Sequence, residues 1–438
     1  MIRIVSFALL VLCVIAQQAH AITIKGQIIA EDGTIPSKVF ISSFLNQAVS
    51  DTIDVNIYGG FTYELKERNP ALFQLKTFRS GFTFFATANN QEVRVFLTVK
   101  AGELIAGNVE DYKENEAYNA LTKMLQTFDV AIEQAIENKE PDSIFKFILR
   151  DFNNELRGFN IFYKGTFAGD TLVQYRFFDW KEMVQKNQYA SLFITSIFKQ
   201  VNFKDDLLRA TPIFSNTIDF FVTALSDYLE AEEKEKQILL LMKQASVSNE
   251  NYKFIAEKVY SLALTKGKEE VAKAFVKWIN SNADSNLIPV LFIKAKRLSA
   301  SMPGKQFIDV PSIDKYTTKS LPEIVASNKF TLLVFWESTC SHCRNTLPIV
   351  KKIYEAFHAK GLEVVAISMD ADVLEWQTHL STLQTTWINT RIEEKNPAIN
   401  QYYISQMPTL ILINKDGVIE KRLAKVEQIG NYLDEKLK

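Results

Sequence analysis

The spacing of apolar residues changes twice along this chain of 438 residues, and these changes constrain its fold more than any other feature. From Ile22 to about Val109, short runs rich in β-branched and aromatic residues alternate with turn signals such as Gly33 and Gly59-Gly60. Closely spaced short strands of this kind predict an antiparallel β-sandwich as the N-terminal domain.

The period becomes helical from about Glu110 to Ser301. Leu121, Leu125, Phe128 and Ile132, for example, recur at steps of three and four residues. This spacing places them on one face of a helix and predicts an all-α middle domain. Its aromatic residues are interpreted as core, with a client-binding groove as the alternative.

A third pattern follows a break that contains Pro303, Gly304 and Pro311. The continuous apolar runs "FTLLVFW" and "LEVVAISMD" read as buried strands, and a helical stretch with Pro348 separates them. Strands and helices that alternate in this way predict a C-terminal α/β domain. The predicted bounds are 22–110 for the β domain, 111–301 for the helical domain and 302–438 for the α/β domain.

The N-terminus has the pattern of a secretory signal peptide. An arginine is followed by an apolar run from Ile4 to Ala16 and then by small residues at Ala19 and Ala21. We therefore expect residues 1–21 to be removed and the mature protein to lie in the periplasm or cell envelope. A retained membrane anchor is the alternative, although the apolar run is shorter than the ~20 residues of a spanning helix.

Charge and cysteine content narrow the functional classes. The 50 basic and 51 acidic side chains give a net charge of -1, and no long basic tract is present, so we predict no nucleic-acid partner. Beyond Cys13 in the predicted signal peptide, the only cysteines are Cys340 and Cys343. A disulfide across three residues restrains little chain entropy, so a structural staple is disfavoured.

The pair Cys340 and Cys343 stands where a buried strand ends and a helix begins. A redox dithiol needs one exposed, partly ionised sulfur and a second sulfur within reach. Cys340 at the helix N-terminus meets the first need, because unpaired N–H groups there stabilise negative charge. Cys343 lies one turn later on the same side. A zinc site is the alternative, but it normally takes four ligands, and only three histidines remain outside the signal peptide.

In these residues the C-terminal region resembles the thioredoxin superfamily, in particular the extracytoplasmic branch typified by TlpA and ResA. The ordered matches are the strand leading into "FWESTCSHC", Pro348 in the following helix, the strand "LEVVAISMD" and "MPTLILINKDG". The resemblance implies a thioredoxin fold and a cis proline beside the dithiol, which matches Pro408. The segment "FKDDLLRATPIFSNTIDFF" resembles the helical region that precedes such a domain in exported proteins of the Bacteroidetes type, and the first zone resembles their β domain.

Three positions depart from the family pattern. Thr339 replaces a tryptophan, Val334 replaces a buried acid, and Thr346 replaces a glutamate that follows the second cysteine. Proton transfer must therefore use water or another group. Glu337 is close in sequence, but we interpret it as a solvated surface carboxylate.

The predicted site has Cys340 as attacking thiol, Cys343 as resolving thiol and His342 as the residue that tunes them. A histidine between the cysteines can carry positive charge near neutral pH and so favour the Cys340 thiolate. Stabilising the reduced form makes the pair a weaker reductant. Met407, Pro408 and Trp336 are expected to contact the client. We predict no metal and no cofactor.

The sequence therefore predicts an exported thiol–disulfide oxidoreductase, a reductase or isomerase that exchanges disulfides with protein substrates. Its electrons could come from a membrane electron-carrier protein. One alternative is a binding or adaptor protein whose β and helical domains hold a partner, with the dithiol as redox sensor. A peroxiredoxin is less consistent with the sequence, because the proline expected at a fixed spacing before the first cysteine is absent.

Overall fold

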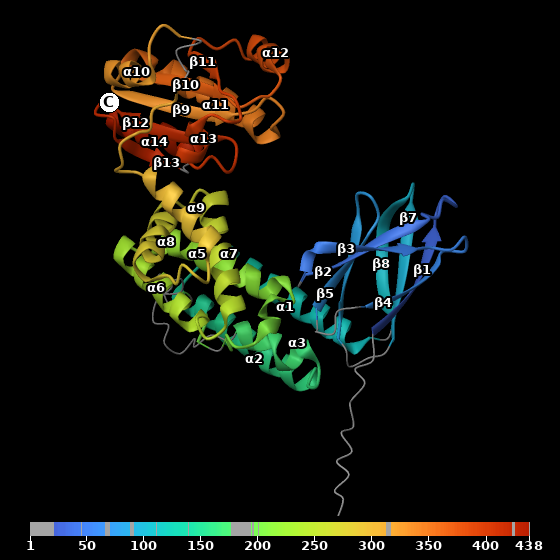
Figure 1. Ribbon diagram of the computed structural model, residues 1–438. Coiled ribbons are helices and arrows are strands. Elements are labelled where there is room, and N and C mark those ends of the chain that lie inside the picture. The colour runs from blue at the N-terminus through green and yellow to red at the C-terminus, as the bar shows by residue number, and fades with distance from the viewer. Residues whose placement is uncertain are drawn as a thin grey trace, which may run out of the picture. The chain divides into compact units, whose positions relative to one another are not determined.

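A computed structural model describes residues 22–437 except 45, 66–70, 88–91, 111, 139, 177–193, 195, 196, 200, 312–316, 423 and 424 (Figure 1). The predicted signal peptide, residues 1–21, lies outside the described residues. By packing, the chain divides into two compact units, Met1–Phe177 with Leu207–Ile213 and Phe178–Asp206 with Phe214–Lys438. The helices predicted as one middle domain are shared between these two units. The predicted domain bounds stay a prediction.

Two four-stranded sheets begin the first unit, in the orders β4-β1-β7-β8 and β3-β2-β5-β6. The strands are β1 (Ile22–Ala30), β2 (Lys38–Ser43), β3 (Asn46–Asp54), β4 (Gly60–Leu65), β5 (Ala71–Lys76), β6 (Gly81–Ala86), β7 (Glu92–Lys100) and β8 (Glu103–Glu110). Ile24 and Val95 of one sheet share a hydrophobic core with Ile41 and Phe84 of the other. The predicted β domain is confirmed, with one parallel pair, β1 and β7, among antiparallel neighbours.

Helices complete the first unit. They are α1 (Lys113–Glu137), α2 (Asp142–Phe162), α3 (Phe167–Asp170) and the 3-10 helix η1 (Leu172–Arg176). A further 3-10 helix, η4 (Asp206–Arg209), lies where the chain passes between the two units. The helical spacing predicted α1 correctly, since Leu121, Leu125, Phe128 and Ile132 are all buried.

Among the described residues that follow 206, helices come first in the second unit. They are α5 (Pro212–Tyr228), α6 (Ala231–Ala245), α7 (Asn249–Thr265), α8 (Glu269–Asn282) and α9 (Pro289–Ala300). The first two residues of α5 group with the first unit. Aromatic residues such as Phe214, Phe221 and Phe275 are fully buried, so the structure supports their interpretation as core. Among the described residues, no helix has the length and apolar character needed to cross a membrane.

The rest of the second unit is an α/β domain built on one sheet of order β11-β10-β9-β12-β13. Its elements are α10 (Leu321–Ser327), β9 (Phe330–Trp336), α11 (Ser341–Phe357), η6 (His358–Lys360), β10 (Leu362–Ser368), α12 (Val373–Leu383), β11 (Ile388–Arg391), α13 (Pro397–Gln401), β12 (Thr409–Asn414), β13 (Ile419–Arg422) and α14 (Val426–Lys436). Strands β9, β10 and β11 are parallel, whereas β12 and β13 run antiparallel to their neighbours.

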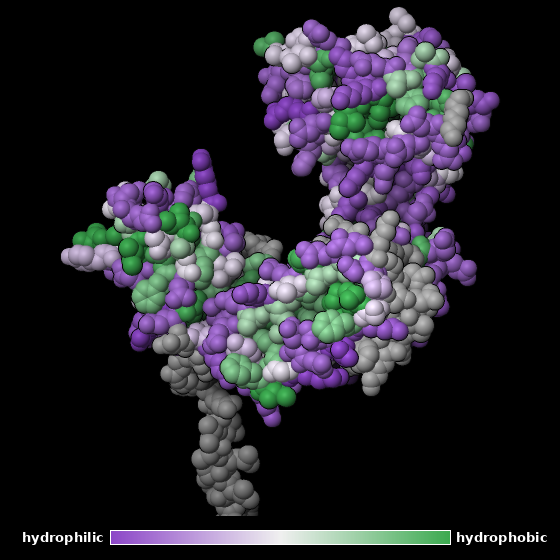
Figure 2. All heavy atoms as spheres, turned by 180° about the vertical axis from the view of Figure 1, so that it is seen from behind, coloured by the Kyte–Doolittle hydropathy of each residue, from purple (hydrophilic) through white to green (hydrophobic). Residues whose placement is uncertain are grey.

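Strand β9 is central because its side chains are buried on both faces of the sheet. Leu332 and Val334 pack with α11 and α14 in one core, and Leu333 and Phe335 pack with α10 and α13 in another. Successive side chains of a strand point to opposite faces, so a continuous apolar run fits only a strand covered on both sides. Hydrophilic residues cover most of the visible surface of this domain, and a band of apolar residues crosses it (Figure 2).

Candidate functional site

The two cysteines lie directly after the central strand. Strand β9 ends at Trp336, and Cys340 is the N-cap residue of α11, with its Sγ accepting a hydrogen bond from the backbone N–H of Cys343 at 3.3 Å. A thiolate at this position gains from the unpaired N–H groups of the first helical turn and from the helix dipole. Both cysteines are free thiols in the structure.

The two sulfurs have different environments. Cys340 is half-buried, whereas Cys343 is fully buried at 0% exposure. Burial raises the pKa of the Cys343 thiol, and a hydrogen bond with Cys340 raises it further. A hydrogen bond from the Glu337 backbone N–H lowers this pKa, but by less. An accessible sulfur therefore stands beside a protonated, shielded one.

A second chain segment completes the site from the neighbouring strand. The Sγ of Cys340 lies 3.6 Å from the carbonyl oxygen of Met407, and the Met407–Pro408 peptide bond is cis, as the family resemblance implied. Both residues are partly exposed and precede β12, which pairs with β9. They are therefore placed where a segment bound to Cys340 would meet them.

The other predicted site residues divide into one that is accessible and one that is not. His342 is exposed on the first turn of α11, one position before the buried Cys343. Trp336 is fully buried, and its ring lies 5.5 Å from that of His379. It presents no surface to a client, so we assign it to the core and not to client contact. Both faces of β9 are covered, so the side chains of residues 331–336 are all buried, Trp336 included.

Sequence reasoning missed a buried carboxylate, Asp370, which is 5% exposed. Its Oδ1 accepts hydrogen bonds from the backbone N–H and the hydroxyl of Ser338, at 2.9 and 2.6 Å, and its Oδ2 accepts one from the Ser368 hydroxyl at 2.7 Å. Asp370 thus fixes the turn between β9 and Cys340. Its position just after β10 was the available signal, because the carboxyl ends of neighbouring parallel strands lie together.

Glu337 differs from its interpretation as a solvated carboxylate. The residue is partly buried, and burial raises the pKa of its carboxyl group, with the negative charge of Asp370 adding to the effect. Its backbone N–H donates a hydrogen bond to the Cys343 sulfur. A carboxyl group whose pKa is raised is a better proton acceptor for a nearby thiol than an ordinary one.

Metal ligands do not gather around the pair. Among the residues that the structure describes, no group of three or more His, Cys, Asp and Glu side chains is arranged to hold a metal ion. His358 and His379 belong to other elements, η6 and α12.

Comparison with known proteins relates the C-terminal α/β domain to a protein family. The family described as thioredoxin-like matches residues 328–419. The chain is 28% identical over 108 residues to the thiol-disulfide oxidoreductase ResA of Bacillus cereus, covering 24% of this chain and 62% of that protein. It is 26% identical over 146 residues to ResA of Oceanobacillus iheyensis, covering 32% of this chain and 74% of that protein.

A solved structure extends over more of the chain. The crystal structure of a thioredoxin-like protein from Bacteroides caccae covers 58% of this chain and 95% of its own, with 18% identity and a TM-score of 0.47. The sequence matches to ResA and to the thioredoxin-like family, by contrast, coincide with the sheet and helices that carry Cys340 and Cys343. The C-terminal α/β domain is thus thioredoxin-like and related to the ResA thiol-disulfide oxidoreductases.

Proposed function

We propose that the protein is a thiol–disulfide oxidoreductase that acts on protein substrates, with Cys340 as the attacking thiol and Cys343 as the resolving thiol. The observation that carries this proposal is the difference between the two sulfurs: Cys340 is partly exposed at a helix N-terminus, and Cys343 is fully buried one turn later. Only the first is accessible to a client disulfide. The second is within reach of a mixed disulfide formed at the first.

The reaction has two exchange steps. The Cys340 thiolate attacks one sulfur of a client disulfide, so that a Cys340–client bond forms, the client S–S bond breaks and one client thiolate leaves and takes up a proton. Cys343 then loses its proton and attacks the Cys340 sulfur, which releases the second client thiol. The enzyme dithiol is oxidised by two electrons and the client disulfide is reduced. The reverse steps oxidise a client dithiol.

His342 would set the balance between these directions. Exposed beside the attacking sulfur, a cationic imidazole favours the thiolate and thereby the reduced enzyme. This makes the pair less reducing and is compatible with a reductase for easily reduced disulfides or with an isomerase. Turnover as a reductase requires a dithiol donor, and a membrane electron-carrier protein is the class of partner that we propose.

The proposed location is the periplasm or cell envelope. Its support is the signal-peptide pattern of residues 1–21 together with the relationship of the C-terminal domain to ResA. An oxidising compartment is also where client disulfides persist.

Insulin reduction tests the activity. The full-length protein with dithiothreitol should accelerate precipitation of insulin chains, and Cys340→Ser should reduce the rate to that of dithiothreitol alone. Equilibration of the dithiol with glutathione then gives its potential and direction. An active Cys340→Ser variant would contradict the proposed role of Cys340, and an inactive parent protein would contradict the activity.

A further inference from the structure

A pocket of about 610 Å³ lies beside the dithiol within the second unit. Helix α11 contributes His342 and Ile349 to its lining, and residues 406–410 and 425–427 of the α/β domain contribute more. The remaining wall is formed by residues 264–267, which are the end of α7 and the start of the turn to α8; this segment is called the α7–α8 turn below. A helical segment far away in sequence therefore borders the space next to the reactive sulfur.

This turn is joined to the α/β domain by direct hydrogen bonds. The Gln406 side chain donates to the carbonyl oxygen of Leu264 at 3.1 Å, next to Met407. At the start of α8, Glu269 accepts a hydrogen bond from the backbone N–H of Arg422 at 3.3 Å. Because both contacts flank the pocket, they hold the turn at a fixed place beside the site.

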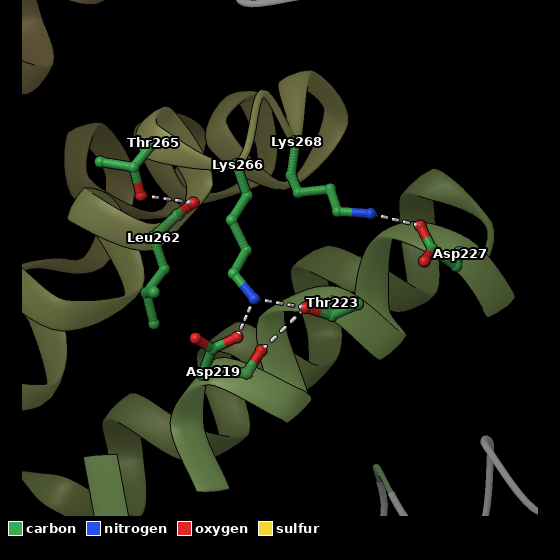
Figure 3. Close-up of polar contacts among 7 residues, drawn as sticks. All are labelled: Asp219, Thr223, Asp227, Leu262, Thr265, Lys266 and Lys268. Atoms are coloured by element: carbon green, nitrogen blue, oxygen red, sulfur yellow. Dashed lines mark hydrogen bonds and ion pairs between the residues drawn. The ribbon is translucent and has the colours of Figure 1, made fainter. Parts of the chain in front are cut away.

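Helix α5 holds the same turn from its other side (Figure 3). The Lys266 ammonium group pairs with Asp219 and lies 3.4 Å from the Thr223 hydroxyl, and Lys268 pairs with Asp227 at 2.7 Å. Both lysines extend from the turn toward α5 in the close-up. Asp219 and Asp227 compensate the charges of the two lysines. The turn is therefore held between α5 on one side and the α/β domain on the other.

The lining is chemically suited to an apolar side chain. Leu264, Ile349, Met407, Pro408, Leu410 and Val426 supply apolar surface, and polar residues such as Asn345 and Gln406 add hydrogen-bonding groups. Removing an apolar side chain from water is favourable in proportion to the area buried. Polar groups at the same place can bind the backbone of an extended segment.

The nearness of the pocket to the Cys340 sulfur indicates what binds in it. The pocket includes Met407, whose carbonyl oxygen is 3.6 Å from the Cys340 sulfur, and His342, two residues after Cys340. Any client linked to Cys340 through a disulfide must place the residues flanking its own cysteine near these positions. A free small molecule or a distant partner surface has no such requirement.

We propose that the α7–α8 turn is a specificity element of the oxidoreductase: together with α11 and the Met407–Pro408 segment, it binds a large apolar side chain adjacent to the client's cysteine. This inference rests on the proposed function. It assigns to the helical part of the second unit a role in choosing clients, and it leaves the exchange chemistry to the two cysteines.

The test uses the full-length Cys343→Ala variant, in which reaction stops at the mixed disulfide. Three disulfides of thionitrobenzoate are compared: a peptide with leucine beside its cysteine, the same peptide with serine there, and mercaptoethanol. Attack by Cys340 on the partner sulfur releases coloured thionitrobenzoate and leaves a Cys340–partner disulfide. The leucine peptide should react about tenfold faster than the serine peptide, as expected for burial of one such side chain.

Thr265 provides the informative substitution because its side chain is exposed and lines the pocket. Thr265→Trp fills the pocket and Thr265→Glu makes it polar, so both should remove the preference for the leucine peptide over the serine peptide. Asn280→Trp, at an exposed site of α8 outside the pocket lining, is the control and should keep the preference. Equal rates for both peptides in the parent, or an unchanged preference in both Thr265 variants, would overturn the inference. Failure of all three disulfides to react would overturn the proposed function instead.

Discussion

The Cys340 sulfur and the Met407 carbonyl oxygen lie 3.6 Å apart although 67 positions separate them in sequence. The sheet produces this proximity, because β9 and β12 pair antiparallel with Phe335 opposite Thr409. The end of β9 that leads to the dithiol therefore meets the beginning of β12 that follows Pro408. A client held at this place would contact both segments.

The unequal exposure of the two sulfurs predicts unequal trapping. Cys343→Ala leaves attack by Cys340 intact and abolishes resolution, so it should accumulate mixed disulfides with client proteins in an envelope extract. Cys340→Ala leaves only a fully buried thiol and should accumulate few. Non-reducing electrophoresis followed by identification of the trapped proteins measures this. Equal trapping by both variants would contradict the division of roles.

The α/β domain was the most predictable part of the fold. Residues 330–336 form a continuous apolar run, which fits a strand buried on both faces, and β9 has these bounds. Cys340 was expected at a helix N-terminus and is the N-cap of α11. The helix starts at Ser341, and its cap is made by the Cys340 sulfur and not by a typical capping side chain.

Features that depend on distant contacts were not predictable in the same way. Asp370 is an ordinary acidic residue in sequence, and only the pairing of β9 with β10 brings it to Ser338. The contact of Gln406 with Leu264 spans 142 positions, and no local pattern announces it. Hydrophobic periodicity specifies which face of an element is buried, but not which element covers it.

Replacing His342 by proline should make the dithiol more reducing. Proline removes a side chain that can be cationic beside Cys340, and its position in the first turn of α11 tolerates the missing N–H. We expect the equilibrium constant with glutathione to shift by about tenfold, which corresponds to roughly 30 mV for a two-electron couple. Redox titration measures it. His358→Ala, directly after the same helix, is the control and should leave the potential unchanged, whereas a more oxidising proline variant would refute the tuning role.

Glu269 should stabilise the second unit through Arg422. Arg422 is 1% exposed, and its Nη2 donates a hydrogen bond to the Tyr403 carbonyl oxygen at 3.1 Å. Burial lowers the pKa of its guanidinium group to about 10, and the negative charge of Glu269 acts in the opposite direction and raises it. Glu269→Ala removes the acceptor of the Arg422 backbone N–H and part of the negative charge near a buried cation, so the free energy of unfolding should fall by about 1–3 kcal/mol. Urea unfolding with a constant m-value measures the change.

The neighbouring carboxylate provides a matched control for this effect. Glu270 pairs with Lys273 at the surface, where its side chain is 48% exposed, and an exposed pair contributes at most about 1 kcal/mol. Glu270→Ala should therefore cost much less than Glu269→Ala. If the two substitutions destabilise equally, the Arg422 charge does not depend on Glu269.

Glu337 should act as the proton acceptor for Cys343 during resolution. Burial and the charge of Asp370 raise the pKa of its carboxyl group, while burial raises that of the Cys343 thiol, so the thiol needs a base before it can attack. With thionitrobenzoate loaded on Cys340, its release reports attack by Cys343. Glu337→Gln should slow this release about tenfold or more, and Glu355→Gln, at an exposed site of α11, should not. In the parent the rate should fall as pH drops through the raised pKa of Glu337, and the Gln variant should lack that step.

The same group gives a stability signature with a definite sign. Because the carboxyl pKa of Glu337 is higher in the folded protein than in the unfolded chain, the folded state binds more protons between the two values. The free energy of unfolding of the parent should therefore fall, relative to Glu337→Gln, as pH rises from the ordinary carboxyl value through the raised one. Denaturant unfolding of both proteins across this window measures the difference. If the parent instead gains stability relative to the variant over the same window, the folded protein favours the charged form of Glu337. Its pKa would then not be raised, and the argument for Glu337 as proton acceptor would fail.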